Sequence, residues 1–151
     1  MSIAVEVGKL AELIAGKFPG AKIHRFQGPD IPGGGDCVIE LRQETRRGDS
    51  RTHTIAERQY AIIYYAEQVE TAIITLEALS RYVMNERPEA ASVGSEASGA
   101  IQAESFVISS PEKLEGGLLR CTGLLLVRSR ESITLPHYDK INKVEIRTTI
   151  N

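Results

Sequence analysis

The sequence predicts an α+β domain in which two helices pack on a mostly antiparallel β-sheet, with a projecting β-hairpin and a C-terminal strand or arm. The first observation is the order of the hydrophobic patterns, which reads helix, three strands, helix, three strands. The second is an abrupt change from a strand pattern to a helix pattern after residue 66. The third is the length of 151 residues, which is near the usual size of one domain and allows a real core. We therefore expect a single domain over residues 1–151.

The strand-to-helix change predicts a helix fixed closely against a sheet. Between residues 60 and 66 both alternating sets of side chains are bulky, which suits a strand covered on both faces. Glu67 and Glu70 in the first helical turn, and Arg81 in the last, match the helix dipole. The apolar residues of this helix form one stripe at helical spacing: Val69, Ala72, Ile73, Leu76, Leu79 and Val83.

The N-terminal part is expected to hold one helix and two strands. Ser2 can cap the helix, which ends at Pro19-Gly20. The glycines at 33–35 lead into a strand, so they lack the helix N-terminus of a phosphate-binding loop, and we interpret them as part of a flexible loop. Three segments follow this helix: a short strand over 21–27, a loop rich in Gly and Pro over 28–35, and a strand over 37–45.

An arginine-rich connection over 46–54 joins the strand at 37–45 to the strand at 60–66, and we expect an antiparallel hairpin whose tip projects. Its cations could contact DNA phosphates or an acidic partner. Alternatively, they could form a solvated tip, with their charge partly neutralised by Glu44, Asp49 and Glu57. No aromatic residue lies among the arginines, so we favour a protein or electrostatic contact. The expected interface residues are Arg42, Arg46, Arg47, Arg51, His53 and Arg58.

The C-terminal part is expected to supply the remaining strands. A loop over 86–99 is rich in Pro, Gly and Ser and is expected to be mobile. Residues 101–109 predict a strand, 111–117 a turn, and 118–129 a long strand with a bend or bulge at Thr122-Gly123. The tail over 138–151 alternates and could be an edge strand or an arm that pairs with a neighbouring subunit. Its expected interface residues are Tyr138, Ile141, Val144 and Ile146.

No constellation of residues predicts catalysis, a metal site or a cofactor. Cys37 and Cys121 lack C-x-x-C spacing, and we expect two small buried residues on strands. The histidines, His24, His53 and His137, are scattered, with no i, i+4 pair. A general acid–base site at His137 would need a partner that the sequence does not supply. We therefore expect a non-enzymatic chain without cofactors.

Composition indicates an ordinary globular protein. Hydrophobic residues make up 42% of the chain and charged residues 25%, which argues against disorder of the whole chain. A net charge of −2 gives no global attraction to nucleic acid or to anionic membranes. No apolar run is long enough to span a bilayer, and charges spread through the first 18 residues break up any signal-peptide core. We expect a protein made and kept in a cytoplasm, without a membrane partner.

The order of these patterns over nearly the full length resembles the tail terminator, or tail-to-head joining, proteins of long-tailed bacteriophages. The resemblance is one of pattern and order, because the family has no diagnostic motif here. It is carried by Phe18-Pro19-Gly20, Tyr60-Ala61-Ile62-Ile63-Tyr64-Tyr65 running into the helix that ends near Tyr82-Val83, Phe106-Val107-Ile108, Gly116-Gly117-Leu118-Leu119 and Tyr138-Asp139-Lys140-Ile141.

The resemblance implies a structural virion protein at the head-proximal end of the tail, assembled in the host cytoplasm. Such a protein forms a ring, expected to be a hexamer, that caps the tail tube, stops its elongation and presents a docking face to the head connector. Its partners would be further copies of itself, the tail tube protein and the connector or neck protein, with non-specific passage of DNA through the lumen. The hairpin and the C-terminal arm would supply the heterologous contacts that a ring requires.

Two other classes of protein stay open. One is another ring of the same particle, such as a head-completion, neck or tail-tube protein, which would differ in its position along the tail. The other is a small cytosolic enzyme or ligand-binding domain that uses the tyrosines and His137 as a pocket. A monomer with one deep polar cleft would favour that last class.

Overall fold

A computed structural model describes residues 1–86 and 101–134 of the chain. The helical elements are α1 (Ile3–Lys17), α2 (Val69–Arg81), the π-helical turn η1 (Tyr82–Glu86) and the 3-10 turn η2 (Glu115–Gly117). The strands are β1 (Lys22–Arg25), β2 (Asp36–Gly48), β3 (His53–Ala66), β4 (Ala103–Ile108), β5 (Glu112–Lys113) and β6 (Leu119–Ser132).

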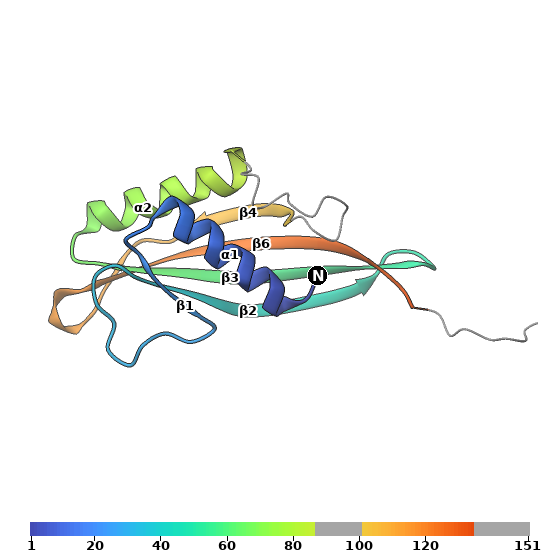
Figure 1. Ribbon diagram of the computed structural model, residues 1–151, viewed down its shortest axis with the longest axis horizontal. Helices are drawn as coiled ribbons and strands as arrows, with labels where there is room; N and C mark the ends of the chain where they lie inside the picture. The colour runs from blue at the N-terminus through green and yellow to red at the C-terminus, as the bar shows by residue number, and fades with distance from the viewer. Residues whose placement is uncertain (87–100, 135–151) are drawn as a thin grey trace, which may run out of the picture.

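The strands form one sheet in the order β1-β2-β3-β6-β4, and β5 also pairs with β6. Only β1 runs parallel to its neighbour, β2, and the other pairs are antiparallel. Both α-helices lie on one face of the sheet (Figure 1). The predicted α+β class and the predicted antiparallel hairpin of β2 and β3 are therefore confirmed.

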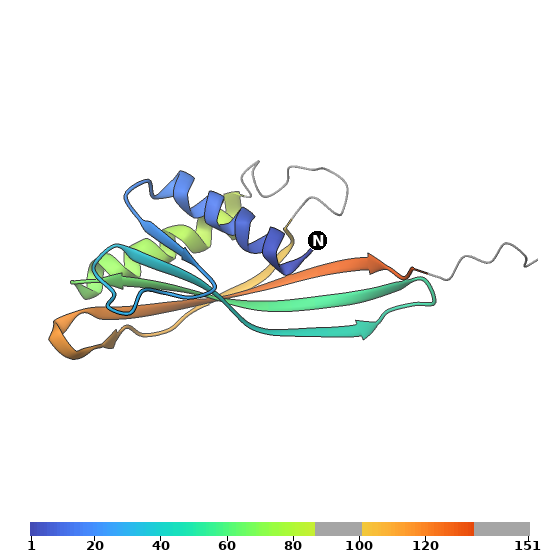
Figure 2. The ribbon, with the colours of Figure 1, turned by 60° about the horizontal axis from the view of Figure 1, so that its bottom comes forward.

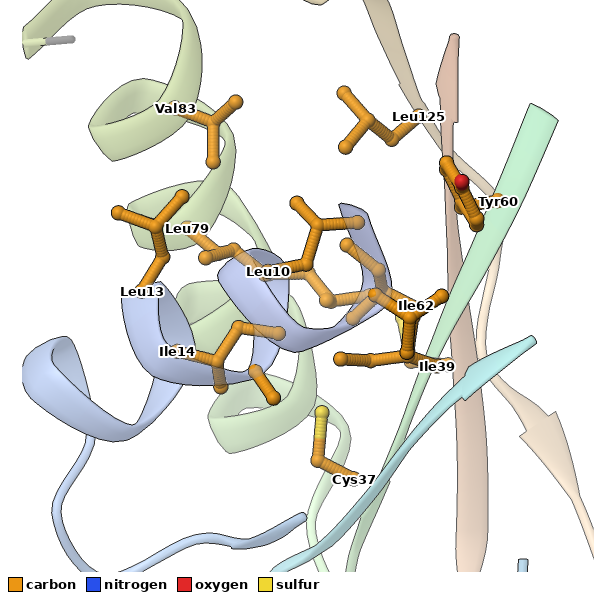
Figure 3. Packing of buried hydrophobic residues seen from close by; sticks show 14 of the residues in the cluster. Leu10, Leu13, Ile14, Cys37, Ile39, Tyr60, Ile62, Leu79, Val83 and Leu125 are labelled. Carbon is orange, nitrogen blue, oxygen red and sulfur yellow. The ribbon is translucent and has the colours of Figure 1, made fainter. Parts of the chain in front are cut away.

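The main core lies between the two helices and this face of the sheet. Leu10 of α1 and Leu79 of α2 point toward Ile39 and Ile62 on the strands, and Leu13 of α1 lies on the side of Leu79 and Val83 (Figure 3). Both cysteines are buried and free, as expected, and both belong to this cluster. Burial raises the pKa of Cys37 to about 12, which keeps its thiol protonated and unreactive at neutral pH.

The helix boundaries follow local chemistry. The Ser2 side chain accepts a hydrogen bond from the Val5 N–H at 3.2 Å, so Ser2 is the N-cap that the sequence predicts. Along α2, Ala72, Leu76 and Leu79 are buried, and Val83 continues their stripe into η1. The predicted stripe is too wide, because Val69 and Ile73 are 50% and 40% exposed. Both lie at the side of the buried stripe, on a part of the helix surface that does not face the strands.

The opposite face of the sheet carries a smaller apolar cluster. Val38, Ala61, Ile63 and Tyr65 are buried there, with Leu114, Leu118 and Leu124 packed against them. The loop after β1 also covers this face, since a Cβ on Gly28 would lie 2.9 Å from a methyl carbon of Val38. Thus β3 is buried on both faces along residues 60–66, as its two bulky sets predict.

The predicted irregularity at Thr122-Gly123 is wrong. Both residues pair in continuous register with β3, at Ile63 and Ile62, and the register with β4 is also unbroken at Gly123. The glycine is there because the Phe106 ring lies over it, and a Cβ would be 2.5 Å from the ring carbon Cε1. The register shifts fall instead between residues 41 and 43 and between residues 103 and 105.

Two expected features, the loop over 86–99 and the strand or arm over 138–151, lie outside the described residues apart from Glu86, which ends η1. Among the residues that are described, no helix is long and apolar enough to cross a membrane.

Replacing Gly123 by alanine should destabilise the fold by about 1–3 kcal/mol, because the new methyl group overlaps the Phe106 ring. Urea unfolding measures the effect. The double variant Gly123→Ala with Phe106→Leu should lose less than the two single variants together.

The matched control for that substitution is Gly16→Ala. A Cβ on Gly16 in α1 has no neighbour within 4 Å, so alanine there should stabilise the helix by about 0.5–1 kcal/mol. Equal changes in unfolding free energy at the two glycines would show that the Phe106 ring is not the reason for a glycine at position 123.

Candidate interface: the distal sheet and its ionic root

Three strands continue past the helix layer and form a projection that we call the distal sheet, residues 43–48, 53–59 and 126–132 (Figure 2). Its pairing is regular, with Gln43, Gln59 and Leu126 aligned across the three strands. The strand β1 pairs with residues 36–39 of β2, so among residues 1–86 and 101–134 no strand pairs with the outer edge of β2 in the distal sheet. Charged side chains line this edge, which discourages unspecific strand addition.

Where the distal sheet leaves the core, Arg58 of β3 is buried among carboxylates. Its side chain is 4% exposed. The guanidinium donates to Glu44 of β2 at 2.7 Å and to the carbonyl of Met1 at 2.8 Å, and it lies 3.0 Å from Glu6 of α1. We call Glu6, Glu44, Arg46, Arg58 and Glu131 the ionic root. Arg58 therefore differs from the expectation of a surface contact residue, because every one of these partners lies within the chain.

Tyr60 extends this network into the core. Its hydroxyl donates to Oε1 of Glu6 at 2.6 Å, and both residues are buried. Burial and this hydrogen bond raise the pKa of Tyr60, so the phenol stays neutral. Burial alone would lower the pKa of Arg58, but its hydrogen bonds to Glu44 and Glu6 raise it above the ordinary value. The cation of Arg58 is therefore permanent.

The charges of the ionic root balance one another. Arg46 pairs with Glu44 and Glu131, and the N-terminal amine lies 3.6 Å from Glu131. Three carboxylates thus meet two guanidinium groups and one amine. An open groove of about 480 Å³ borders them, lined by Met1, Ser2, Ile3, Glu44, Arg46, Arg58 and Glu131. Because each charge has a partner, this arrangement suits positioning of α1 against the strands rather than reaction with a substrate.

The two faces of the distal sheet differ in character. The face toward α1 carries the ionic root. On the other face, Arg47, Ile55 and Arg130 align in one row across the strands, and Thr45, Glu57 and Arg128 align in the next. We call this second surface the basic face. Arg47 lies 3.9 Å from Glu57, and Arg130 donates to Asp49 in the turn at 2.8 Å.

The predicted hairpin residues therefore do not form one patch. Arg47 lies on the basic face, Arg51 is exposed in the turn, and His53 is bonded to Thr52 beside it. Arg42 lies at the register shift and pairs with Glu40 at 3.4 Å. Arg46 and Arg58 belong to the ionic root. The expected residues of the C-terminal arm, Tyr138, Ile141, Val144 and Ile146, lie outside the described residues.

Sequence reasoning missed four contributors: Glu6, Glu131, Arg128 and Arg130. The last two continue the period-two pattern of β6 beyond Leu126: Arg128 already lies in the predicted strand, and extending that strand past residue 129 would have added Arg130 to the same face. Glu6 gives no such signal, because an isolated acid on a helix is ordinarily solvated.

The other candidate sites have structural explanations. At the glycine-rich loop, the N–H of Gly33 donates to Oδ2 of Asp36 at 2.7 Å, and His24 lies 3.0 Å from the other carboxylate oxygen. A shallow depression of about 420 Å³ between this loop and the start of α2 is bordered by Glu67. Within residues 1–86 and 101–134, no three His, Cys, Asp or Glu side chains gather as a metal site would require.

Comparison with known proteins gives no assignment. No protein-family model matches the sequence, and no curated protein matches it significantly.

Replacing Arg58 by methionine should cost about 3–5 kcal/mol of unfolding free energy, because Glu6 would stay buried without its cation. Chemical denaturation provides the measurement. The control Arg47→Met removes a half-exposed arginine of the same strand pair and should change stability by less than about 0.5 kcal/mol. Similar losses in both variants would contradict a special role for the ionic root.

Acid should weaken the ionic root. The hydrogen bond from Arg58 holds the pKa of Glu44 below its ordinary 4.5, and the one from Arg46 does the same for Glu131. Their contribution is complete above about 4.5, the unfolded value, and is lost as the pH falls toward the lower folded values. Unfolding free energies measured between pH 7 and pH 3 should fall less steeply in Glu44→Gln than in the wild type. Parallel curves would refute this account.

Proposed function

We propose that this chain is a structural protein of a long-tailed bacteriophage that assembles into a ring, expected to be hexameric, at the head-proximal end of the tail. The ring would cap the tail tube, stop its elongation and present a docking face to the head connector. We assign the chain no catalytic role and no cofactor.

The observation that carries the proposal is the distal sheet. Three strands project past the helices, and β3 of this projection is 14 residues long in all. Ile55, Ala56 and Val127 are buried in this projection, but residues 43–52 are all exposed. Its outer part therefore adds exposed backbone edge and little apolar burial, and does little for the stability of an isolated subunit. A protein that joins neighbours around an axis has a use for such a surface.

The ionic root supports the same proposal. A surface that takes part in a closed ring must be held at a fixed angle, because small angular errors accumulate around the axis. The guanidinium of Arg58 is bonded to three separate segments, the N-terminus, α1 and β2. Together with Glu131 of β6, these contacts hold the base of the distal sheet. The resemblance to tail terminators then gives the ring its place in the particle.

Electron microscopy of the purified protein tests the proposal. We expect rings of uniform diameter with a central hole, because a heterologous contact that closes gives one defined subunit number. Labelled protein on intact particles should lie where the tail meets the head. A label along the tube or inside the head would assign the chain to another ring of the particle. A protein that stays monomeric at high concentration would refute the ring.

A further inference from the structure

The basic face of the distal sheet carries an excess of positive charge. Four arginines lie on this face or at its tip, Arg47, Arg51, Arg128 and Arg130, against two carboxylates, Asp49 and Glu57. Arg51 and Arg128 form no ion pair within the described residues. This face therefore has guanidinium groups free to meet an anionic partner.

A surface of opposite character lies on α2, in the body of the subunit. Glu70 and Glu77 are exposed on the helix and Glu67 is exposed just before it, and Arg81 offsets only one of them, in a pair with Glu77 at 3.1 Å. Val69, Ile73 and Ile74 are between 40% and 57% exposed on the same helix. We call this the acidic face of α2. Its exposed apolar and acidic side chains are left uncovered by the part of the chain that the structure describes.

The spacing of the charges on the two faces matches. Glu70 and Glu77 lie on one side of α2, about 10 Å apart along its axis. Arg47 and Arg130, which also pair within the chain with Glu57 and Asp49, lie about 10 Å apart, because one strand separates them. Between the glutamates are Ile73 and Ile74, and Ile55 lies between the two arginines in their row.

We infer that the basic face of one copy docks on the acidic face of α2 of the next copy. The contact is heterologous, since the two faces differ and lie on different parts of the subunit, so repeating it generates a ring when the rotation between copies closes. The inference rests on the proposed ring and assigns its subunit contact. The partner is a second copy rather than DNA, because Glu57 and Asp49 among the arginines would repel phosphates and because apolar side chains lie exposed on the opposing helix.

Charge reversal tests the contact. Variant A carries Arg47→Glu and Arg130→Glu, and variant B carries Glu70→Arg and Glu77→Arg. Each alone would place like charges against each other, so we expect the concentration for half-assembly to rise at least about tenfold in light scattering or sedimentation.

An equimolar mixture of the two variants should recover rings of wild-type diameter. In the mixture, the acidic sheet of variant A meets the basic helix of variant B, and the basic sheet of variant B meets the acidic helix of variant A. Recovery also shows that both variants fold. The control Lys22→Glu with Lys113→Glu makes the same change of charge as variant A at exposed positions outside both faces and should assemble like the wild type.

The outcomes separate the two proposals. Rings of wild-type stability from variants A and B would overturn this contact while leaving the ring itself intact. Folded variants that form no rings when mixed would also overturn this contact. So would a variant A that assembles like the wild type but no longer binds a DNA duplex. A wild-type chain that stays monomeric would overturn both proposals.

Discussion

The burial of one cation, Arg58, constrains much of this structure. A guanidinium removed from water must be paired on most of its donors, or the fold loses several kcal/mol. Here the acceptors come from the N-terminus, from α1 and from β2, with Glu131 of β6 close by. Satisfying this cation therefore fixes the start of α1 over the sheet and holds three long strands in one register. The Tyr60 hydroxyl links this network to the apolar core through Glu6.

The two halves of the sheet are stabilised by different forces. Near the helices, β3 is buried on both faces by aliphatic and aromatic side chains, so the hydrophobic effect dominates. Beyond the helices the same strands carry charged rows, and ion pairs between the strands stabilise the sheet instead. Such pairs contribute little at an exposed surface, so the distal sheet depends on its ionic root for rigidity. Charged edges also reduce the risk that it pairs with the wrong strand.

This division of forces relates the fold to the proposed assembly. The face of the distal sheet toward α1 is neutralised within the chain, whereas the opposite face keeps an excess of arginine. The surplus apolar and acidic surface lies instead on α2, where the predicted stripe proved wider than the sheet could cover. A subunit with two unlike, complementary surfaces on a stiff body is suited to head-to-tail closure, which connects the local charge pattern to the proposed ring.

The sequence by itself determined the elements whose signal is local: the cap at Ser2, the two helices, the hairpin, and the two-faced burial of β3 through alternating bulky residues. Period two would even place Arg58 on the same face as Tyr60 and Ile62, toward the core. Only the tertiary structure decided the partners, because Glu6 lies 52 residues before Arg58 and pairing across that distance leaves no local pattern. It also decided the role of Gly123. From sequence alone, a glycine in a strand can indicate either a bulge or the close approach of another side chain. Only the position of the Phe106 ring distinguishes the two.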